Sequence, residues 1–400
     1  MTTTINNEHK KLNVPNKREQ NQTCLDSAER EGLRPKGNVP NLRFPEFQGE
    51  WEKCTLEDVM NFSTTRVNSS ELNEDNYVST DNMLQDYQGI VDAKSVPEDV
   101  NVISFSCGDI LISNIRPYLK KVWKATYNGG CSSDVFVLKA NDNIESDYLH
   151  YVIANDKFIN FVMSGAKGVK MPRGDKKQMK TYCLSLPQIQ EQKKTSTLLR
   201  LIDERISTQS EIIGKLQSLI KGIRHDIFKD IQGEVLALSN IADIYQPQTI
   251  SSSDLTSEGY WVYGANGIIG KYKEYNHETE QICITCRGNT CGTVNYTQPK
   301  VWITGNSMVI NTDKYQRQVN KRFLFHYLSS YNFKSIVSGS GQPQIVRTPL
   351  EKIKVVLPTI EKQVRIANSI DIVSEKINTE SSVLRLLENQ KQYLLRQMFI

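Results

Sequence analysis

The chain has 400 residues, 38% of them hydrophobic and 24% charged, which is enough for two or three domains that each bury a core. No run approaches the roughly 18 apolar residues of a membrane-spanning helix, and the N-terminus lacks the apolar core of a secretion signal. We therefore expect a cytoplasmic protein with no membrane partner. A net charge of +4 is too small to indicate a nucleic-acid partner by itself.

Residues 1–37 are polar, mixed in charge and almost free of aromatic side chains, which predicts a disordered tail. Residues 38–187 then alternate turn signals with short segments of strand character, such as DILIS at 109–113 and DVFVL at 134–138. An amphipathic stretch follows at 147–163. This pattern predicts a first globule of mixed α and β structure.

A long helix is predicted for residues 188–230, because apolar residues now follow one another at alternating spacings of three and four. Pro187 suits the first helical turn, where its missing N–H would have no partner. Gln209 is the single polar interruption of this heptad seam, which is otherwise apolar and includes Leu199, Ile202, Ile206, Ile213, Leu216 and Ile220.

The pattern then repeats. Residues 231–357 again contain strand-like segments, QICIT and SMVI, and one helix-like segment at 322–333, which predicts a second globule. A second long helix is predicted for 358–400, with Glu380 at the place of Gln209 and a seam that includes Ile370, Val373, Ile377, Leu384, Leu387 and Leu394.

Residues 186–192 read LPQIQEQ and residues 357–363 read LPTIEKQ, which sets a repeat of 171 positions, the difference between 357 and 186. The chain therefore resembles a tandem duplication. We predict an α+β fold, with two mixed α/β globules separated by two long helices. Pairing the helices as an antiparallel coiled coil would bury both seams and relate the repeats by a pseudo-two-fold axis.

Two similar but divergent globules held by spacer helices suit a bipartite linear target, such as DNA half-sites one or two helical turns apart, at about 34 Å per turn. A heptad seam also has simpler interpretations. It could be ordinary core packing, or it could form a homodimer.

Basic residues alternate with aromatic ones in 113–128 and gather again in 165–180, where they could neutralise DNA phosphates. A solvated charged surface is the alternative interpretation. The candidates in the first globule are Arg116, Tyr118, Lys120, Lys121, Lys124, Lys167, Lys170, Arg173, Lys176 and Lys177.

The corresponding segments of the second globule carry amides and arginines beside glycines. Arginine can contact guanine through two hydrogen bonds, and asparagine or glutamine can do the same with adenine. An ordinary surface turn is the alternative. The candidates here are Arg287, Asn289, Thr290, Gln342, Gln344 and Arg347.

A zinc site built from Cys283, Cys286, Cys291 and His277 is a candidate, because the first two cysteines have C-x₂-C spacing. A second such pair is missing from the sequence. The phosphate-binding G-x-x-x-x-G-K-[ST] motif, the dinucleotide-binding G-x-G-x-x-G motif and the Asn-Pro-Pro-aromatic motif of amino-methyltransferases are also missing. We therefore predict no metal, no cofactor and no catalytic residue on this chain.

The doubled LP-x-I-x-x-Q motif before a heptad helix, together with VPNLRFPEFQGEW, ILISNIRPYL, GAKGVKMPRG and SGSGQPQI, resembles the specificity subunit of type I restriction-modification enzymes. The resemblance covers about residues 38–400. It implies that each globule recognises one half of a split sequence in double-stranded DNA. It also implies that the helices set the spacer and dock two methyltransferase subunits.

The same resemblance implies further partners, namely restriction subunits that translocate DNA. S-adenosylmethionine, ATP and magnesium would then be bound by the partner subunits. Two other classes stay open at this point: a coiled-coil adaptor whose globules bind proteins or glycans, and a metal-dependent nuclease centred on the cysteines. Steeply salt-dependent binding to duplex DNA would distinguish a DNA-recognition subunit from the adaptor.

Overall fold

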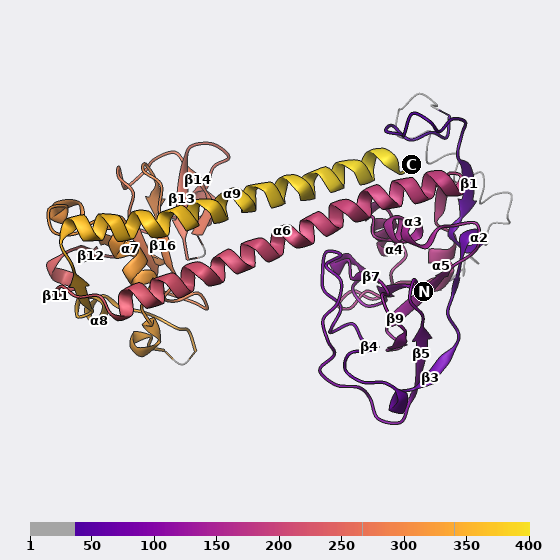
Figure 1. Ribbon diagram of the computed structural model, residues 1–400, viewed down its shortest axis with the longest axis horizontal. Helices are drawn as coiled ribbons and strands as arrows, with labels where there is room; N and C mark the ends of the chain where they lie inside the picture. Colours follow the sequence, from indigo (N-terminus) through magenta and orange to yellow (C-terminus); the bar gives the residue numbers. More distant parts are fainter. Residues whose placement is uncertain (1–36, 266, 340) are drawn as a thin grey trace, which may run out of the picture. The chain divides into compact units, whose positions relative to one another are not determined.

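The structure is a computed structural model that describes residues 37–265, 267–339 and 341–400 (Figure 1). Apart from Gly37, the tail predicted to be disordered lies outside the described residues. The chain divides into two compact units, and each is described by itself. Unit 1 comprises Met1–Ile206 and Leu386–Ile400, and unit 2 is Ser207–Arg385.

Unit 1 contains two four-stranded sheets and a two-stranded ribbon. The first sheet is antiparallel in the order β2-β9-β6-β7, from Met60–Phe62, Val135–Ala140, Ile110–Ser113 and Val122–Lys124. The second has the order β3-β5-β8-β4, from Arg66–Asn68, Asn101–Phe105, Gly129–Cys131 and Tyr77–Val78. The ribbon pairs β1 (Glu52–Thr55) with β10 (Cys183–Leu186).

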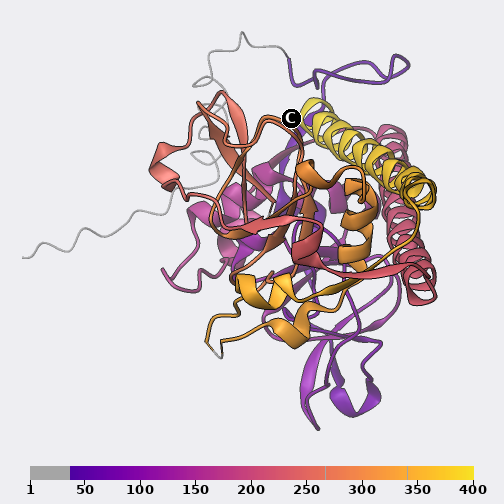
Figure 2. The same cartoon turned by 90° about the vertical axis from the view of Figure 1, so that its left-hand side faces the viewer.

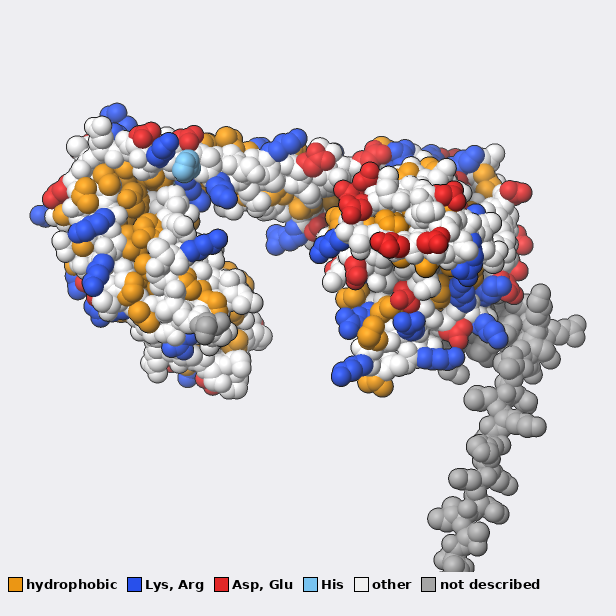
Figure 3. Space-filling view, turned by 90° about the horizontal axis from the view of Figure 1, so that it is seen from below, with side chains coloured by type: hydrophobic (Ala, Val, Ile, Leu, Met, Phe, Trp, Pro, Cys, Tyr) orange, Lys and Arg blue, Asp and Glu red, His pale blue; other side chains and the backbone are white. Residues whose placement is uncertain are grey.

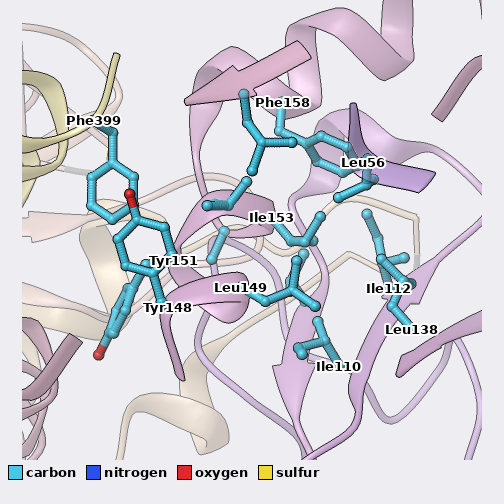
Figure 4. Packing of buried hydrophobic residues seen from close by; sticks show 14 of the residues in the cluster. Leu56, Ile110, Ile112, Leu138, Tyr148, Leu149, Tyr151, Ile153, Phe158 and Phe399 are labelled. Carbon is cyan, nitrogen blue, oxygen red and sulfur yellow. The ribbon is translucent and has the colours of Figure 1, made fainter. Parts of the chain in front are cut away.

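The helices of unit 1 cover the first sheet. They are α2 (Leu56–Val59), α3 (Ser146–Ile153), α4 (Asp156–Ser164) and α5 (Lys176–Lys180). The amphipathic stretch at 147–163 forms two helices rather than one, because the Asn155 side chain accepts the Lys157 N–H and caps α4. In Figure 4, α3 side chains such as Leu149 lie near Ile110 and Leu138 of the sheet in a shared core.

Unit 2 repeats this plan. Its four-stranded antiparallel sheet has the order β12-β18-β15-β16, from Asp243–Tyr245, Ser307–Asn311, Ile282–Thr285 and Val294–Tyr296. A second sheet joins β14 (Gly267–Tyr272), β13 (Tyr260–Gly264) and β17 (Trp302–Ile303), and a ribbon joins β11 (Glu234–Ala237) to β19 (Lys354–Leu357). The helices are α7 (Lys321–Ser330) and α8 (Arg347–Glu351). The matching order of the four-stranded sheets confirms two related α+β globules.

The two long helices are α6 (Ile189–Lys229) and α9 (Ile360–Met398), and each contributes residues to both units. Every predicted seam position on them is buried or half-buried, including Gln209 and Glu380. Within unit 1, Leu199 and Ile202 share a core cluster with Leu394. No helix in the described ranges combines the length and apolarity needed to cross a bilayer.

The helices are antiparallel within unit 2. Gln209 contacts Glu380, whereas Arg224, which lies further along α6, is joined through the imidazole of His326 to Asp371, which lies earlier in α9. Figures 1 and 2 both show these segments of α6 and α9 side by side. In unit 1, Lys391 of α9 forms an ion pair of 2.6 Å with Asp203 of α6.

The repeated LP-x-I-x-x-Q motif fixes the start of each long helix. The fully buried amide of Gln192 donates to the carbonyl of Pro187 at 2.8 Å and accepts from the backbone N–H of Glu145, the residue that caps α3. Gln363 donates to Pro358 at 2.9 Å and accepts from the N–H of Asn320, which caps α7. The motif therefore anchors each long helix to the globule that precedes it.

The far end of each long helix is anchored by an aromatic ring. Phe228, near the end of α6, packs edge-to-face on Phe323 of α7, with ring centroids 5.6 Å apart, within unit 2. Phe399, just after α9, stacks on Tyr148 of α3, with centroids 5.1 Å apart, within unit 1 (Figure 4). Phe228 and Phe399 are 171 positions apart, so equivalent phenylalanines make an aromatic contact in both repeats, edge-to-face in unit 2 and stacked in unit 1.

Candidate nucleic-acid interface

The two basic segments of the first globule meet at one place in unit 1. The backbone N–H of Arg116 donates to the carbonyl of Pro172 at 2.8 Å, and the N–H of Gly174 donates to Asn114 at 3.1 Å. Ile115 and Arg173 form an isolated antiparallel bridge. No local pattern predicted that 113–128 and 165–180 would be neighbours. Their contact brings Arg116 beside the second segment.

The second segment contains a closed loop, residues 168–172, which we call tip loop 1. Lys167 and Arg173 exchange two backbone hydrogen bonds of 3.0 and 2.9 Å at its base. Gly168 has φ +97°, a conformation that side chains other than glycine rarely adopt. The backbone of this loop is therefore fixed at its base, and the side chain of Val169 in the loop is fully exposed.

Unit 2 builds the same loop from different side chains. Ser338 and Gln344 exchange two backbone hydrogen bonds of 2.8 Å, and Gly339 has φ +90°. We call residues 339–343 tip loop 2, of which position 340 lies outside the described residues. The backbone N–H of Gly288 donates to the carbonyl of Pro343 at 3.0 Å. Arg287 and Gln344 form an isolated antiparallel β-bridge.

The two tip loops correspond residue by residue at the 171-position repeat. Arg116 and Arg287 occupy the same position, so an arginine lies beside each loop. The residues that close the loops differ: Lys167 and Arg173 in unit 1 become Ser338 and Gln344 in unit 2. The backbone frame is thus shared, whereas the hydrogen-bonding and charged groups on it have changed.

Six of the candidates in unit 1 are exposed. Four of them lie in tip loop 1 or close to it along the chain, and the other two are Arg116, which contacts the loop, and Tyr118. Among these, Arg116 has φ +49°, a strained conformation for a non-glycine residue that is often found at functional sites. The six are Arg116, Tyr118, Lys167, Lys170, Arg173 and Lys177.

Partners within the protein hold the four other lysines. Lys120 lies 2.9 Å from Asp156, and Lys124 forms an ion pair with Asp147. The ammonium of Lys121 donates to the carbonyl of Thr80 at 2.6 Å. Lys176 lies 4.7 Å from the ring centroid of Phe136, and burial lowers its pKa. Each would have to exchange these contacts to bind a phosphate group, so their roles stay predictions.

The candidates of unit 2 are mostly exposed. Arg287, Asn289, Gln342 and Gln344 all face solvent. Thr290 is half-buried and donates to the carbonyl of Ala265 at 3.4 Å, while Arg347 pairs with Glu351 at 2.7 Å. On the face that Figure 3 shows, basic side chains lie scattered among acidic and uncharged surface rather than in one continuous patch.

The cysteines of unit 2 do not converge. Cys283 lies in one core cluster and Cys286 in another. Cys283 is in β15 and Cys286 directly follows it, and residues three apart along an extended strand face opposite sides. The imidazole of His277 is hydrogen-bonded to Tyr245 at 2.8 Å and to Asn276 at 2.6 Å, and burial lowers its pKa to about 4. Among the described residues, no group of three or more potential ligands is placed to hold a metal ion. The zinc hypothesis therefore has no geometric support.

The two repeats share a second surface, on the exposed side of the long helices. The heptad pattern did not reveal this surface, because the pattern describes only the apolar seam. Leu201 of α6 and Ile372 of α9 are repeat-equivalent and exposed, at 52% and 68%. Neighbouring exposed positions at helical spacing are also alike in the two repeats. We call the set the shared helix face: Leu201, Glu204, Arg205 and Thr208 on α6, and Ile372, Glu375, Lys376 and Thr379 on α9.

Two copies of a globule followed by a long helix, with loops of one backbone frame and different side chains, are typical of a duplicated recognition protein. The family described as "Type I restriction modification DNA specificity domain" matches residues 48–218 and again 231–389. These ranges make up more than half of the chain, and the chain belongs to this family.

Individual relatives agree with this assignment. The chain is 27% identical over 162 residues to the type I restriction enzyme EcoprrI specificity subunit of Escherichia coli, covering 39% of this chain and 40% of that protein. It is 26% identical over 317 residues to the MjaVIII specificity subunit of Methanocaldococcus jannaschii, covering 67% of this chain and 72% of that protein. The first of these matches thus spans less than half of the relative's length.

Solved structures share the fold. The S subunit of a type I restriction-modification system from M. genitalium superposes with a TM-score of 0.63 at 16% identity, covering 90% of this chain and 99% of that one. A chain from a study of complex assembly of a type I system superposes with a TM-score of 0.52 at 17% identity, covering 86% and 96%.

Proposed function

We propose that this chain is a DNA-recognition subunit in which each globule binds one half of a bipartite double-stranded target. The observation that carries the proposal is the pair of tip loops. Two loops share one length, one glycine position and one closing pattern of hydrogen bonds, yet they present different side chains. A constant frame with variable side chains is what two half-sites of different sequence would require.

The exposed groups beside these loops suit this role. Lys167, Lys170 and Lys177 in unit 1 supply positive charge for phosphate contacts, which carry affinity but little sequence information. Arg287, Gln342 and Gln344 in unit 2 have the hydrogen-bonding geometry that distinguishes guanine and adenine in the major groove. The sequence read by each globule would follow from these side chains.

The long helices would set the spacer between half-sites and dock two methyltransferase subunits. A helix of about 40 residues is about 60 Å long at about 1.5 Å per residue, so its length can define a distance along DNA. The shared helix face supports docking. On each long helix an exposed apolar residue has an acidic, a basic and a threonine side chain at the same spacings, which would offer two similar sites for one kind of partner.

Catalysis would then be performed by other subunits. Methyltransferase subunits would bind S-adenosylmethionine, and restriction subunits would use ATP and magnesium to move and cut DNA. The roles of this chain would be to select the sequence and to position those subunits on it. Its own residues would hold bases and phosphates rather than reacting atoms.

Salt dependence tests the proposal directly. The full chain, assembled with its methyltransferase partner, should bind its duplex target with an affinity that falls steeply and linearly on a log–log plot against salt. Lys170→Ala should reduce the magnitude of that slope by about 0.9 if one phosphate contact is lost. Lys53→Ala, an exposed lysine on the β1 strand, is the control and should leave the slope unchanged. Salt-insensitive or absent binding would favour the protein- or glycan-binding adaptor.

A further inference from the structure

Tip loop 1 exposes apolar side chains where the surrounding surface is basic. The side chain of Val169 is fully exposed, and that of Met171 is 47% exposed. Two apolar side chains exposed within one short loop are a candidate contact surface for a ligand. Neither residue belongs to the set of candidates that the sequence analysis selected.

The loop backbone is anchored on both sides. Lys167 and Arg173 close its base, Pro172 accepts from Arg116, and Gly174 donates to Asn114. Because these bonds already fix the flanks, holding Val169 and Met171 against a ligand requires little further ordering of the backbone. The backbone on both flanks of these two residues is therefore anchored.

Charge indicates which ligand this surface fits. Exposed Lys167, Lys170, Arg173 and Lys177 lie in or next to the loop. Two acids pair with part of this rim: Lys167 lies 3.2 Å from Asp175, which also accepts from the Lys177 N–H at 2.8 Å, and Arg173 lies 3.1 Å from Asp134. The rim still carries more positive than negative charge. An apolar tip with a cationic rim matches a polyanion whose groove contains an apolar group, and the C5-methyl of thymine in the major groove is such a group.

We infer that Val169 and Met171 contact thymine methyl groups in the half-site bound by unit 1, and that they are specificity-determining residues. This inference rests on the proposed DNA-recognition function and adds the class of base that is read. The repeat supports it, because Gln342 occupies in tip loop 2 the position of Met171. The same loop backbone would thus carry a residue that contacts thymine methyl groups in the first globule and an amide side chain in the second.

Replacing thymine by uracil, which lacks only the methyl group, gives a direct test. Each thymine of both half-sites is replaced singly in synthetic duplexes, and binding to the full chain with its methyltransferase partner is measured. At one or two positions, all within one half-site, uracil should weaken binding about fourfold, the effect of one buried methyl group. Val169→Ser and Met171→Gln should each reduce that sensitivity at its own position.

Controls separate this inference from the proposed function. Lys170→Ala should weaken binding to all duplexes alike and keep the uracil effect, because a phosphate contact carries no sequence information. Unchanged melting temperatures of Val169→Ser and Lys170→Ala would show that the fold is retained. Absence of specific binding by the unmodified chain would instead contradict the DNA-recognition function itself.

Three results would overturn the inference while leaving DNA recognition intact. The first is a half-site bound by unit 1 that contains no A·T pair. The second is a uracil effect of the same size in the parent chain and in both loop variants. The third is a Val169→Ser variant that weakens binding equally for thymine and uracil duplexes and reduces DNA bending, which would indicate a wedge between base steps instead.

Discussion

The side-chain amide of Gln209 donates to the backbone carbonyl of Glu380 at 3.1 Å, and these two residues occupy the same position in the two repeats. The carboxylate of Glu380 also accepts from Gln209 and pairs with Lys376 at 2.5 Å. Equivalent residues of the two antiparallel helices thus meet close to the end of the helix segments that belong to unit 2, residues 207–229 and 360–385. A polar pair at one seam position can fix the register of a coiled coil.

Gln209→Ala should lower the free energy of unfolding by about 1 kcal/mol, because the mutation removes the donor to Glu380 in a largely covered seam. Denaturant titration of the full chain measures this change. Gln217→Ala, an exposed position on the same helix, is the matched control and should have an effect close to zero. Equal losses in both variants would show that the seam contact contributes nothing specific.

Gln192→Ala and Gln363→Ala should each loosen one globule. Each substitution removes three hydrogen bonds and leaves buried backbone groups unpaired, which we expect to cost about 3 kcal/mol. Hydrogen exchange should speed up for α3 amides in the first variant and for α7 amides in the second. Gln190→Ala, at an exposed position two residues before Gln192, should change neither helix. Faster exchange of both helices in either variant would contradict separate anchors.

Leu201→Asp and Ile372→Asp should each abolish docking of one methyltransferase subunit, because a carboxylate would be desolvated at the centre of each proposed contact. Native mass spectrometry of the assembled complex should then show one such subunit per chain in place of two. Leu219→Asp is the control, because Leu219 is equally exposed but its repeat equivalent is Gln390. Full occupancy in both variants would disprove docking through the shared helix face.

Acid should destabilise the protein between about pH 6.5 and pH 4. Burial lowers the pKa of His150, His277 and His326 to about 4, so in this window the unfolded chain binds more protons than the folded one. The free energy of unfolding should therefore fall as the pH is lowered. His326 is also flanked by Arg224, Arg322 and Asp371, whose own pKa is held low by Arg322 and His326 despite burial.

Denaturant titrations at pH 7.0, 5.5 and 4.5 measure this dependence. His326→Gln should be less stable than the parent at pH 7.0, yet it should lose less stability on acidification, because one titrating group is gone. Gln217→Ala, at an exposed position of α6, removes no titratable group and should keep the parental slope. An unchanged slope in His326→Gln would contradict the assignment of a neutral, buried imidazole.

Much of the fold was predictable, because it follows from local patterns. The 3–4 spacing of apolar residues gave the two long helices within one or two residues of their ends, and alternating apolar runs gave β6, β9, β15 and β18. The amphipathic pattern at 147–163 did not show that the stretch divides into two helices, because Asn155 competes for the backbone and starts a new helix there.

The candidate interface was less predictable, because it depends on contacts between segments far apart in the chain. Nothing local in 113–128 indicates that Arg116 will donate to Pro172. The repeat indicated only that the two segments correspond, since an arginine and a proline are separated by the same interval in both globules, from 116 to 172 and from 287 to 343. It did not give the donor, which is Arg116 in unit 1 and Gly288 in unit 2. Likewise, a lysine-rich segment does not reveal that Lys124 pairs with Asp147 while Lys170 faces solvent.

Exchange of one recognition globule tests the central claim most directly. Residues 38–187 would be replaced by the first globule of another family member that keeps an aromatic residue at the position of Tyr148, which stacks on Phe399. The methylated sequence of host DNA would then be determined by methylation-sensitive sequencing. We predict that one half of the bipartite sequence changes while the other half and the spacer stay the same. A change in both halves, or in neither, would contradict the account.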